Sequence, residues 1–203
     1  SFCPASCLAP DEGIIHENLL TNRTPLLYIL HKLFNPFAGN EIGYRRSVFI
    51  LSLITPVLFY LCIKQKFKKE ENLLLALIAS TIFLSPYFRT SSYWGLEENY
   101  GLISLLFSFI FLNSFLENQQ ENNYKIYFQL FLSIFFSSLC IYFDQKLLIV
   151  PIICFLTIIT SKKKNTLKIF SIFFYLILSF PYIYLITLWG GLFPIELTES
   201  RNL

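Results

Sequence analysis

The stretch YFQLFLSIFFSSLCIYF, residues 127–143, decides the fold class of this chain. It contains no Asp, Glu, Lys or Arg, and its few polar residues do not form the stripe that an amphipathic soluble helix shows. An uninterrupted apolar helix of about 17–20 residues, rising 1.5 Å per residue, matches the ~30 Å hydrocarbon core of a bilayer. Residues 127–143 are therefore predicted to span a membrane.

The same pattern recurs along the chain. Apolar residues make up 55% of the sequence and charged residues only 14%, against roughly 25% charged in soluble domains. We predict an all-α, polytopic transmembrane helical bundle with about six spans: 47–63, 72–88, 100–116, 126–143, 147–160 and 169–189. The fifth predicted span is short, since a span usually needs at least about 17 residues.

The predicted organisation has three regions. Residues 1–46 form an extracytoplasmic loop with an acidic motif, residues 47–189 form the transmembrane helical domain, and residues 190–203 begin a further outer loop. The chain starts with Ser and contains no Met, which favours a fragment of a longer protein. Within the first region, TPLLYILHKLF (24–34) has a Thr cap and a Pro in its first turn. It is too short and too charged to span, so we expect a helix that lies along the membrane interface.

The loops predict which ends of the spans share a side of the membrane. The short loops 64–71 and 162–168 carry four lysines each, and with Lys125 they hold 9 of the 16 basic residues. Short basic loops stay on the cytoplasmic side. The opposite side receives 9 of the 13 acidic residues, including those of residues 1–46. The predicted topology alternates without contradiction.

Three polar clusters fall on the predicted outer side. The first is Asp11-Glu12 with His16, Glu17 and Arg45-Arg46, the second lies within 89–99, and the third is Asp144-Gln145-Lys146. A carboxylate can accept the proton of an incoming hydroxyl, and Arg and Lys can hold phosphate oxygens. Taken singly, each cluster is more often a solvated loop.

Two further pairs of residues have both a functional and a structural interpretation. His16 and His31 could ligate a metal ion with Asp11, but isolated histidines 15 residues apart are more often structural. Tyr93 and Trp94 could stack on a sugar, but aromatic residues also gather at membrane interfaces regardless of function.

Short motifs of the chain follow one another in a distinctive order. They are Asp11-Glu12, Thr24-Pro25-Leu26-Leu27-Tyr28, Arg45-Arg46-Ser47, Ser85-Pro86 followed by Glu98, and Gln145-Lys146. This order resembles the GT-C superfamily of membrane glycosyltransferases, including the protein O-mannosyltransferases and the lipid A aminoarabinose transferases. The eukaryotic lipid-linked-oligosaccharide glucosyltransferases have a similar layout, so the subfamily stays open.

The resemblance implies a reaction and a set of site residues. An integral membrane glycosyltransferase would move a sugar from a polyprenyl-phosphate donor to an acceptor hydroxyl on the extracytoplasmic face. Asp11 would be the general base, beside Glu12, and Glu98 would orient the acceptor or bind a divalent cation, the one cofactor implied. The donor phosphate would be held by Arg45, Arg46, Arg89 and Lys146.

The implied partners are the polyprenyl-phosphate-linked sugar, a lipid, glycan or protein acceptor, and membrane lipids, with no nucleic acid. The implied location is a bacterial inner (plasma) membrane. Two alternatives from other classes are a membrane transporter and a non-catalytic membrane scaffold. Against a transporter, the predicted spans contain no ionisable residue and no paired Gly/Pro interruption in mid-membrane.

Overall fold

The computed structural model describes residues 26–37, 39–94, 96–118 and 124–189, and every regular element in these ranges is helical, which confirms the all-α fold class. In chain order the elements are α2 (Leu26–Phe34), α3 (Glu41–Ser52), α4 (Ile54–Lys66), α5 (Asn72–Ser80), the 3-10 helix η2 (Thr81–Leu84), α6 (Pro86–Trp94), α7 (Glu97–Glu117), α8 (Tyr124–Phe143), the 3-10 helix η3 (Gln145–Leu148), α9 (Ile149–Thr160) and α10 (Asn165–Trp189).

Four helical stretches in the described ranges are long and apolar enough to cross a membrane: Ile42–Lys66, Glu97–Glu117, Tyr124–Phe143 and Asn165–Thr187. A fifth crossing is possible if the bent pair of α5–η2 and α6 counts as one span. The stretch Gln145–Thr160 is apolar but shorter than a span. The chain is thus shown to be a polytopic apolar helical bundle, and the predicted number of six spans is not confirmed.

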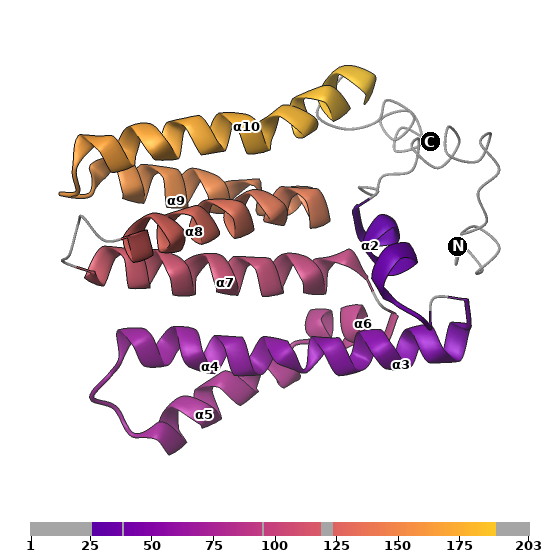
Figure 1. The fold of residues 1–203 in the computed structure, drawn as a ribbon. Helices are drawn as coiled ribbons and strands as arrows, with labels where there is room; N and C mark the ends of the chain where they lie inside the picture. Colours follow the sequence, from indigo (N-terminus) through magenta and orange to yellow (C-terminus); the bar gives the residue numbers. More distant parts are fainter. Residues whose placement is uncertain (1–25, 38, 95, 119–123, 190–203) are drawn as a thin grey trace, which may run out of the picture.

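The helices α7 and α8 form the centre of the bundle. Figure 1 shows them side by side, with α4 packed against α7 and with α9 and α10 on the other side. The core contains large side chains that are entirely buried, among them Phe115, Ile126 and Leu130. Serines such as Ser108 and Ser133 lie between these helices, where small residues let helix backbones approach closely.

The predicted span 72–88 is not one straight helix. It divides at Ser85, whose backbone is extended (φ −66°, ψ 117°), and α5–η2 and α6 meet there at a bend of 68°. Pro86 explains the break, because its ring disfavours the helical conformation at the preceding residue and it has no N–H to continue the helix. The predicted absence of paired Gly/Pro interruptions is not contradicted by this single break, but the straight span expected over 72–88 is not observed.

A second proline, Pro181, lies inside α10 without ending it. The Tyr142 hydroxyl of α8 donates to the Leu178 carbonyl at 2.6 Å and accepts from the Tyr182 N–H at 3.1 Å. It therefore stands between a donor and an acceptor that would bond each other in a regular helix. A side chain from a neighbouring helix thus satisfies the backbone that the proline disturbs.

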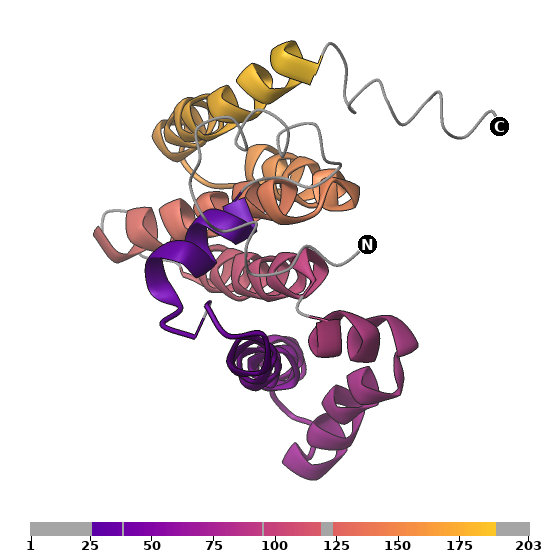
Figure 2. The ribbon, with the colours of Figure 1, turned by 90° about the vertical axis from the view of Figure 1, so that its right-hand side faces the viewer.

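The bundle has two chemically different ends, which Figure 1 shows at its right and left. The polar end contains α2, α6, the starts of α3 and α7, and the corner between α8 and η3. Figure 2 looks onto this end, where α2 and α6 lie on different sides of α3. The basic end contains the α4–α5 and α9–α10 connections and the end of α7.

Candidate functional site

The polar end brings two of the predicted clusters together. At Gly101 on α7, an added Cβ would lie 2.6 Å from the Leu147 Cδ1, so the start of α7 and η3 approach each other closely. The approach places Glu98, just before Gly101 on α7, near Asp144, just before η3. Residues almost 50 positions apart in sequence therefore share one small region.

Tyr87 on α6 lies at the centre of this region. The carboxylates of Glu98, Asp144 and Glu97 all lie close enough to its hydroxyl to act on it electrostatically. The Lys146 ammonium lies over the Tyr87 ring, 6.0 Å from the centroid. We call Tyr87, Glu98, Asp144 and Lys146 the Tyr87 cluster. It combines carboxylates with one cation, which is the mixture expected of a site that moves a proton beside an anionic group.

One feature of the Tyr87 cluster fixes its geometry, and another leaves polar atoms free to bind a ligand. Asp144 caps η3 by accepting the Lys146 N–H at 3.0 Å, which holds its carboxylate in place. The Glu98 Oε2 atom and the neighbouring Gln145 Nε2 atom are buried and make no hydrogen bond within the described part of the chain. Buried polar atoms are rarely left in this state, so both could bind a ligand atom.

An open pocket of about 290 Å³ lies on α6 beside the cluster, lined by Pro86, Arg89, Thr90, Tyr93 and Trp94. Arg89 is exposed, and its guanidinium has no ion pair among the described residues. The Arg45 guanidinium of α3 lies 4.9 Å from the Trp94 ring and 5.7 Å from the Tyr93 ring. Arg45 therefore contacts the aromatic pair, and Arg89 lines the same pocket as that pair.

The sequence of α6 accounts for this pocket. Phe88, Ser91 and Ser92 are buried and face the bundle, which turns Arg89 and Tyr93 outward. Ser92 is further held because its Oγ accepts from the Asn99 amide at 2.9 Å. These contacts dock α6 on the start of α7, so the pocket and the Tyr87 cluster keep a fixed relation.

His31 is a structural residue in this arrangement. Its Nε2 lies 2.7 Å from the Tyr100 hydroxyl and its Nδ1 lies 3.0 Å from the Asn35 amide nitrogen, which also donates to the Ser47 Oγ. Because both ring nitrogens have partners and burial lowers the pKa of His31, the ring is held neutral. The structural interpretation of this histidine is therefore favoured over metal ligation. No group of three His, Cys, Asp or Glu side chains suited to a metal ion occurs in the described ranges.

The other predicted site residues are placed as follows. Asp11, Glu12 and His16 lie outside the described residues. Arg46 is exposed at the start of the first apolar stretch. Arg45 contacts the rings of Tyr93 and Trp94. The sequence did not indicate that these two aromatic residues would bind an arginine.

Sequence reasoning missed Tyr87 as a site residue and left Asp144 without a role. The one signal in the sequence that could have pointed to Tyr87 is its position directly after Pro86, where the new helix α6 begins.

Comparisons of the chain with protein-family models, curated proteins and solved structures find no match. The resemblance to GT-C glycosyltransferases accordingly rests on the short motifs alone.

Proposed function

We propose that this chain is part of an integral membrane glycosyltransferase that moves a sugar from a polyprenyl-phosphate donor to an acceptor hydroxyl at the polar end. The observation that supports the proposal best is the Tyr87 cluster, in which a buried Glu98 oxygen, without a hydrogen-bond partner among the described residues, lies near Asp144 and Lys146. Three elements that are separate in sequence contribute to it, and it lies beside a pocket with an exposed arginine.

The proposed chemistry divides between two groups of residues. Asp11, with Glu12, would remove the acceptor proton, and Glu98 would orient the acceptor or hold a divalent cation. Arg89 and Lys146 would hold the donor phosphate, whose negative charge grows as the sugar leaves. Arg45 and Arg46 would add to this positive field from α3. The membrane would be a bacterial inner membrane, with the polar end on its extracytoplasmic face.

A transfer assay tests this proposal. The full chain in liposomes would be supplied with polyprenyl-phosphate-linked hexose or pentose carrying a radiolabel and with a lipid and glycan extract as acceptor, and movement of label from the lipid donor to the acceptor would be measured. Asp11→Asn should lower the rate by roughly 10²–10⁴-fold, the range for loss of a general base. Glu98→Gln should also lower it, whereas Glu17→Gln and Glu117→Gln should leave it unchanged. Failure of every donor, or equal effects of all four substitutions, would refute the proposal.

A labelling experiment tests the sidedness separately. Thr90 at the polar end and Asn165 at the basic end are both exposed, so a cysteine at either position is accessible to a thiol reagent. In intact cells, a reagent that cannot cross membranes should label Thr90→Cys and not Asn165→Cys. The reverse result would place the Tyr87 cluster in the cytoplasm.

One observation favours the alternative of a transporter. The bend of 68° at Ser85–Pro86 makes α5–η2 and α6 a broken helix pair, and broken helices form substrate sites in many transporters. Such sites usually combine two broken helices in corresponding positions, and one bent pair is found in the described ranges. Uptake of labelled sugar without loss of sugar from the lipid donor would support transport.

A further inference from the structure

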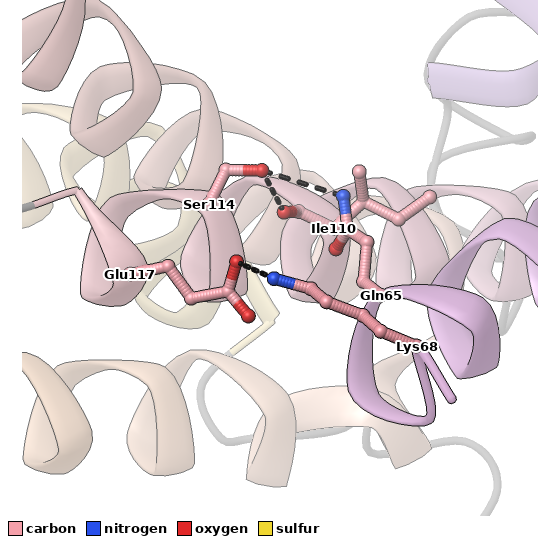
Figure 3. A network of polar contacts seen from close by, with 5 residues as sticks. All are labelled: Gln65, Lys68, Ile110, Ser114 and Glu117. Atoms are coloured by element: carbon pink, nitrogen blue, oxygen red, sulfur yellow. Dashed lines mark hydrogen bonds and ion pairs between the residues drawn. The ribbon is translucent and has the colours of Figure 1, made fainter. Parts of the chain in front are cut away.

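The basic end joins two lysine-rich connections at the end of α7. Lys68, from the α4–α5 connection, lies 2.6 Å from a Glu117 carboxylate oxygen (Figure 3). Lys163, from the α9–α10 connection, donates to the backbone carbonyl of the next residue, Asn118. Segments about 95 residues apart in sequence therefore meet at two adjacent residues and form one surface.

This surface carries a large excess of positive charge. Residues 64–71 and 161–168 contain eight lysines and two glutamates, and Glu117 is the further acid that the described part of the chain places at this junction. Lys68 already pairs with Glu117. Lys66, Lys69 and Lys162 are exposed, and their side chains make no hydrogen bond or ion pair within the described part of the chain. Their charges are available to a partner.

Exposed aromatic side chains accompany the lysines. Phe67, between Lys66 and Lys68, is 53% exposed, and Tyr124 at the start of α8 is 85% exposed. Both lie where an apolar helix ends or begins, which is the depth of the lipid headgroups if these helices cross the bilayer. Aromatic residues next to lysines are typical of segments that insert at an interface while their charges meet anionic headgroups.

We propose that the basic end binds anionic phospholipid headgroups of the adjacent leaflet, with Lys66, Lys69 and Lys162 as the principal contacts. The ammonium groups are opposite in charge to the lipid phosphates. Phe67 and Tyr124 would insert at the boundary between headgroups and acyl chains. A soluble polyanion would satisfy the lysines but not the aromatic side chains. The proposal is independent of the glycosyltransferase assignment, because it concerns the opposite end of the bundle.

The test measures lipids retained by the full chain. Protein would be purified from nanodiscs that contain equal amounts of phosphatidylglycerol and phosphatidylcholine, and bound lipids would be counted by native mass spectrometry. Phosphatidylglycerol should be enriched on the unmodified chain. The triple variant Lys66→Gln/Lys69→Gln/Lys162→Gln should lose that enrichment, by up to about fivefold per lysine. Raising the salt concentration should weaken it as well, because exposed charges are screened.

Two matched variants keep the test decisive if the triple variant folds poorly. Replacement of the same lysines by arginine should preserve the enrichment, and Lys32→Gln, which removes a charge at the polar end, should not change it. Equal enrichment in the unmodified chain and a folded triple Gln variant would overturn the proposal. So would an equal loss in Lys32→Gln, or complete displacement of the lipid by soluble glycerol phosphate at the same concentration.

Discussion

The two ends of this bundle are held together by different interactions. At the polar end, partly or fully buried neutral groups are hydrogen-bonded across helices: His31 of α2 to Tyr100 of α7, and Asn99 of α7 to Ser92 of α6. At the basic end, the ion pair of Lys68 and Glu117 is open to solvent, with 62% and 52% of the side chains exposed. Buried hydrogen bonds fix a geometry, whereas exposed ion pairs respond to salt and to neighbouring charge. The polar end is therefore the better place for a site that needs fixed distances.

The largest expected effect concerns His31. His31→Ala would leave the Tyr100 hydroxyl and the Asn35 amide without a ring partner in a partly buried region. An unsatisfied buried group costs about 1–3 kcal/mol, so thermal unfolding in detergent micelles should occur several degrees lower. Lys32→Ala, at the exposed neighbouring position of α2, serves as the control and should have little effect. Equal effects of the two substitutions would mean that the polar end is not held by this hydrogen-bond network.

Tyr142 provides a second test of buried hydrogen bonding near the polar end. Tyr142→Phe removes the hydroxyl that joins Leu178 and Tyr182 around Pro181, and should cost about 0.6–1.7 kcal/mol, the range for hydrogen bonds between membrane helices. Pro181→Ala restores a backbone N–H and allows a regular helix. The cost of Tyr142→Phe should therefore be smaller in the Pro181→Ala background, which a double-mutant cycle measures.

Tyr175 supplies the control for that cycle. Its hydroxyl also makes a contact between helices, 2.9 Å from the Ser137 Oγ, but it does not bridge the backbone around a proline. The cost of Tyr175→Phe should be the same with Pro181 and with Ala at that position. Coupling of equal size for both tyrosines would mean that Pro181 acts through general packing of α10.

Protonation of His31 at low pH should destabilise the fold less than His31→Ala does, because the protonated ring stays in place. Burial lowers the pKa of His31 below its ordinary value, so the unfolded chain binds the proton more readily than the folded one. The contribution of His31 is therefore complete above the unfolded pKa of about 6.5 and is lost as the pH falls below it. Unfolding temperatures measured from pH 7.5 to pH 5 should decline more for the unmodified chain than for His31→Gln. Identical slopes would show that His31 does not titrate with folding.

The helical fold was predictable because it depends on local composition. Charge-free stretches such as 127–143 became helices, and α2 formed where a short helix was expected. The two prolines show the limit of this reasoning. A bend of 68° lies at Pro86, whereas α10 continues through Pro181, where the Tyr142 hydroxyl of another helix bonds the disturbed backbone. A single sequence records the proline but not the neighbour that compensates for it.

The candidate site was predictable only in outline. The sequence indicated polar groups at one end of the spans, and Glu98, Asp144 and Lys146 do meet there around Tyr87. That grouping depends on the close approach at Gly101, a contact between residues distant in sequence. The contact of Arg45 with Trp94 depends in the same way on how α6 docks. Contacts of this kind follow from tertiary packing and leave no local signal in the sequence.

The smallest effect is expected at the basic end. Lys68→Gln removes the exposed ion pair with Glu117, and such pairs contribute roughly 0–1 kcal/mol because solvent screens them and both side chains lose freedom. The unfolding temperature should change by little, and Glu117→Gln should have the same small effect. High salt should remove any difference between these variants and the unmodified chain, whereas it should leave the effect of His31→Ala unchanged. A loss from Lys68→Gln as large as that from His31→Ala, or one that persists at high salt, would contradict the contrast between the two ends. The Lys68 contact would then be a fixed structural element, and the basic end would be as rigidly organised as the polar one.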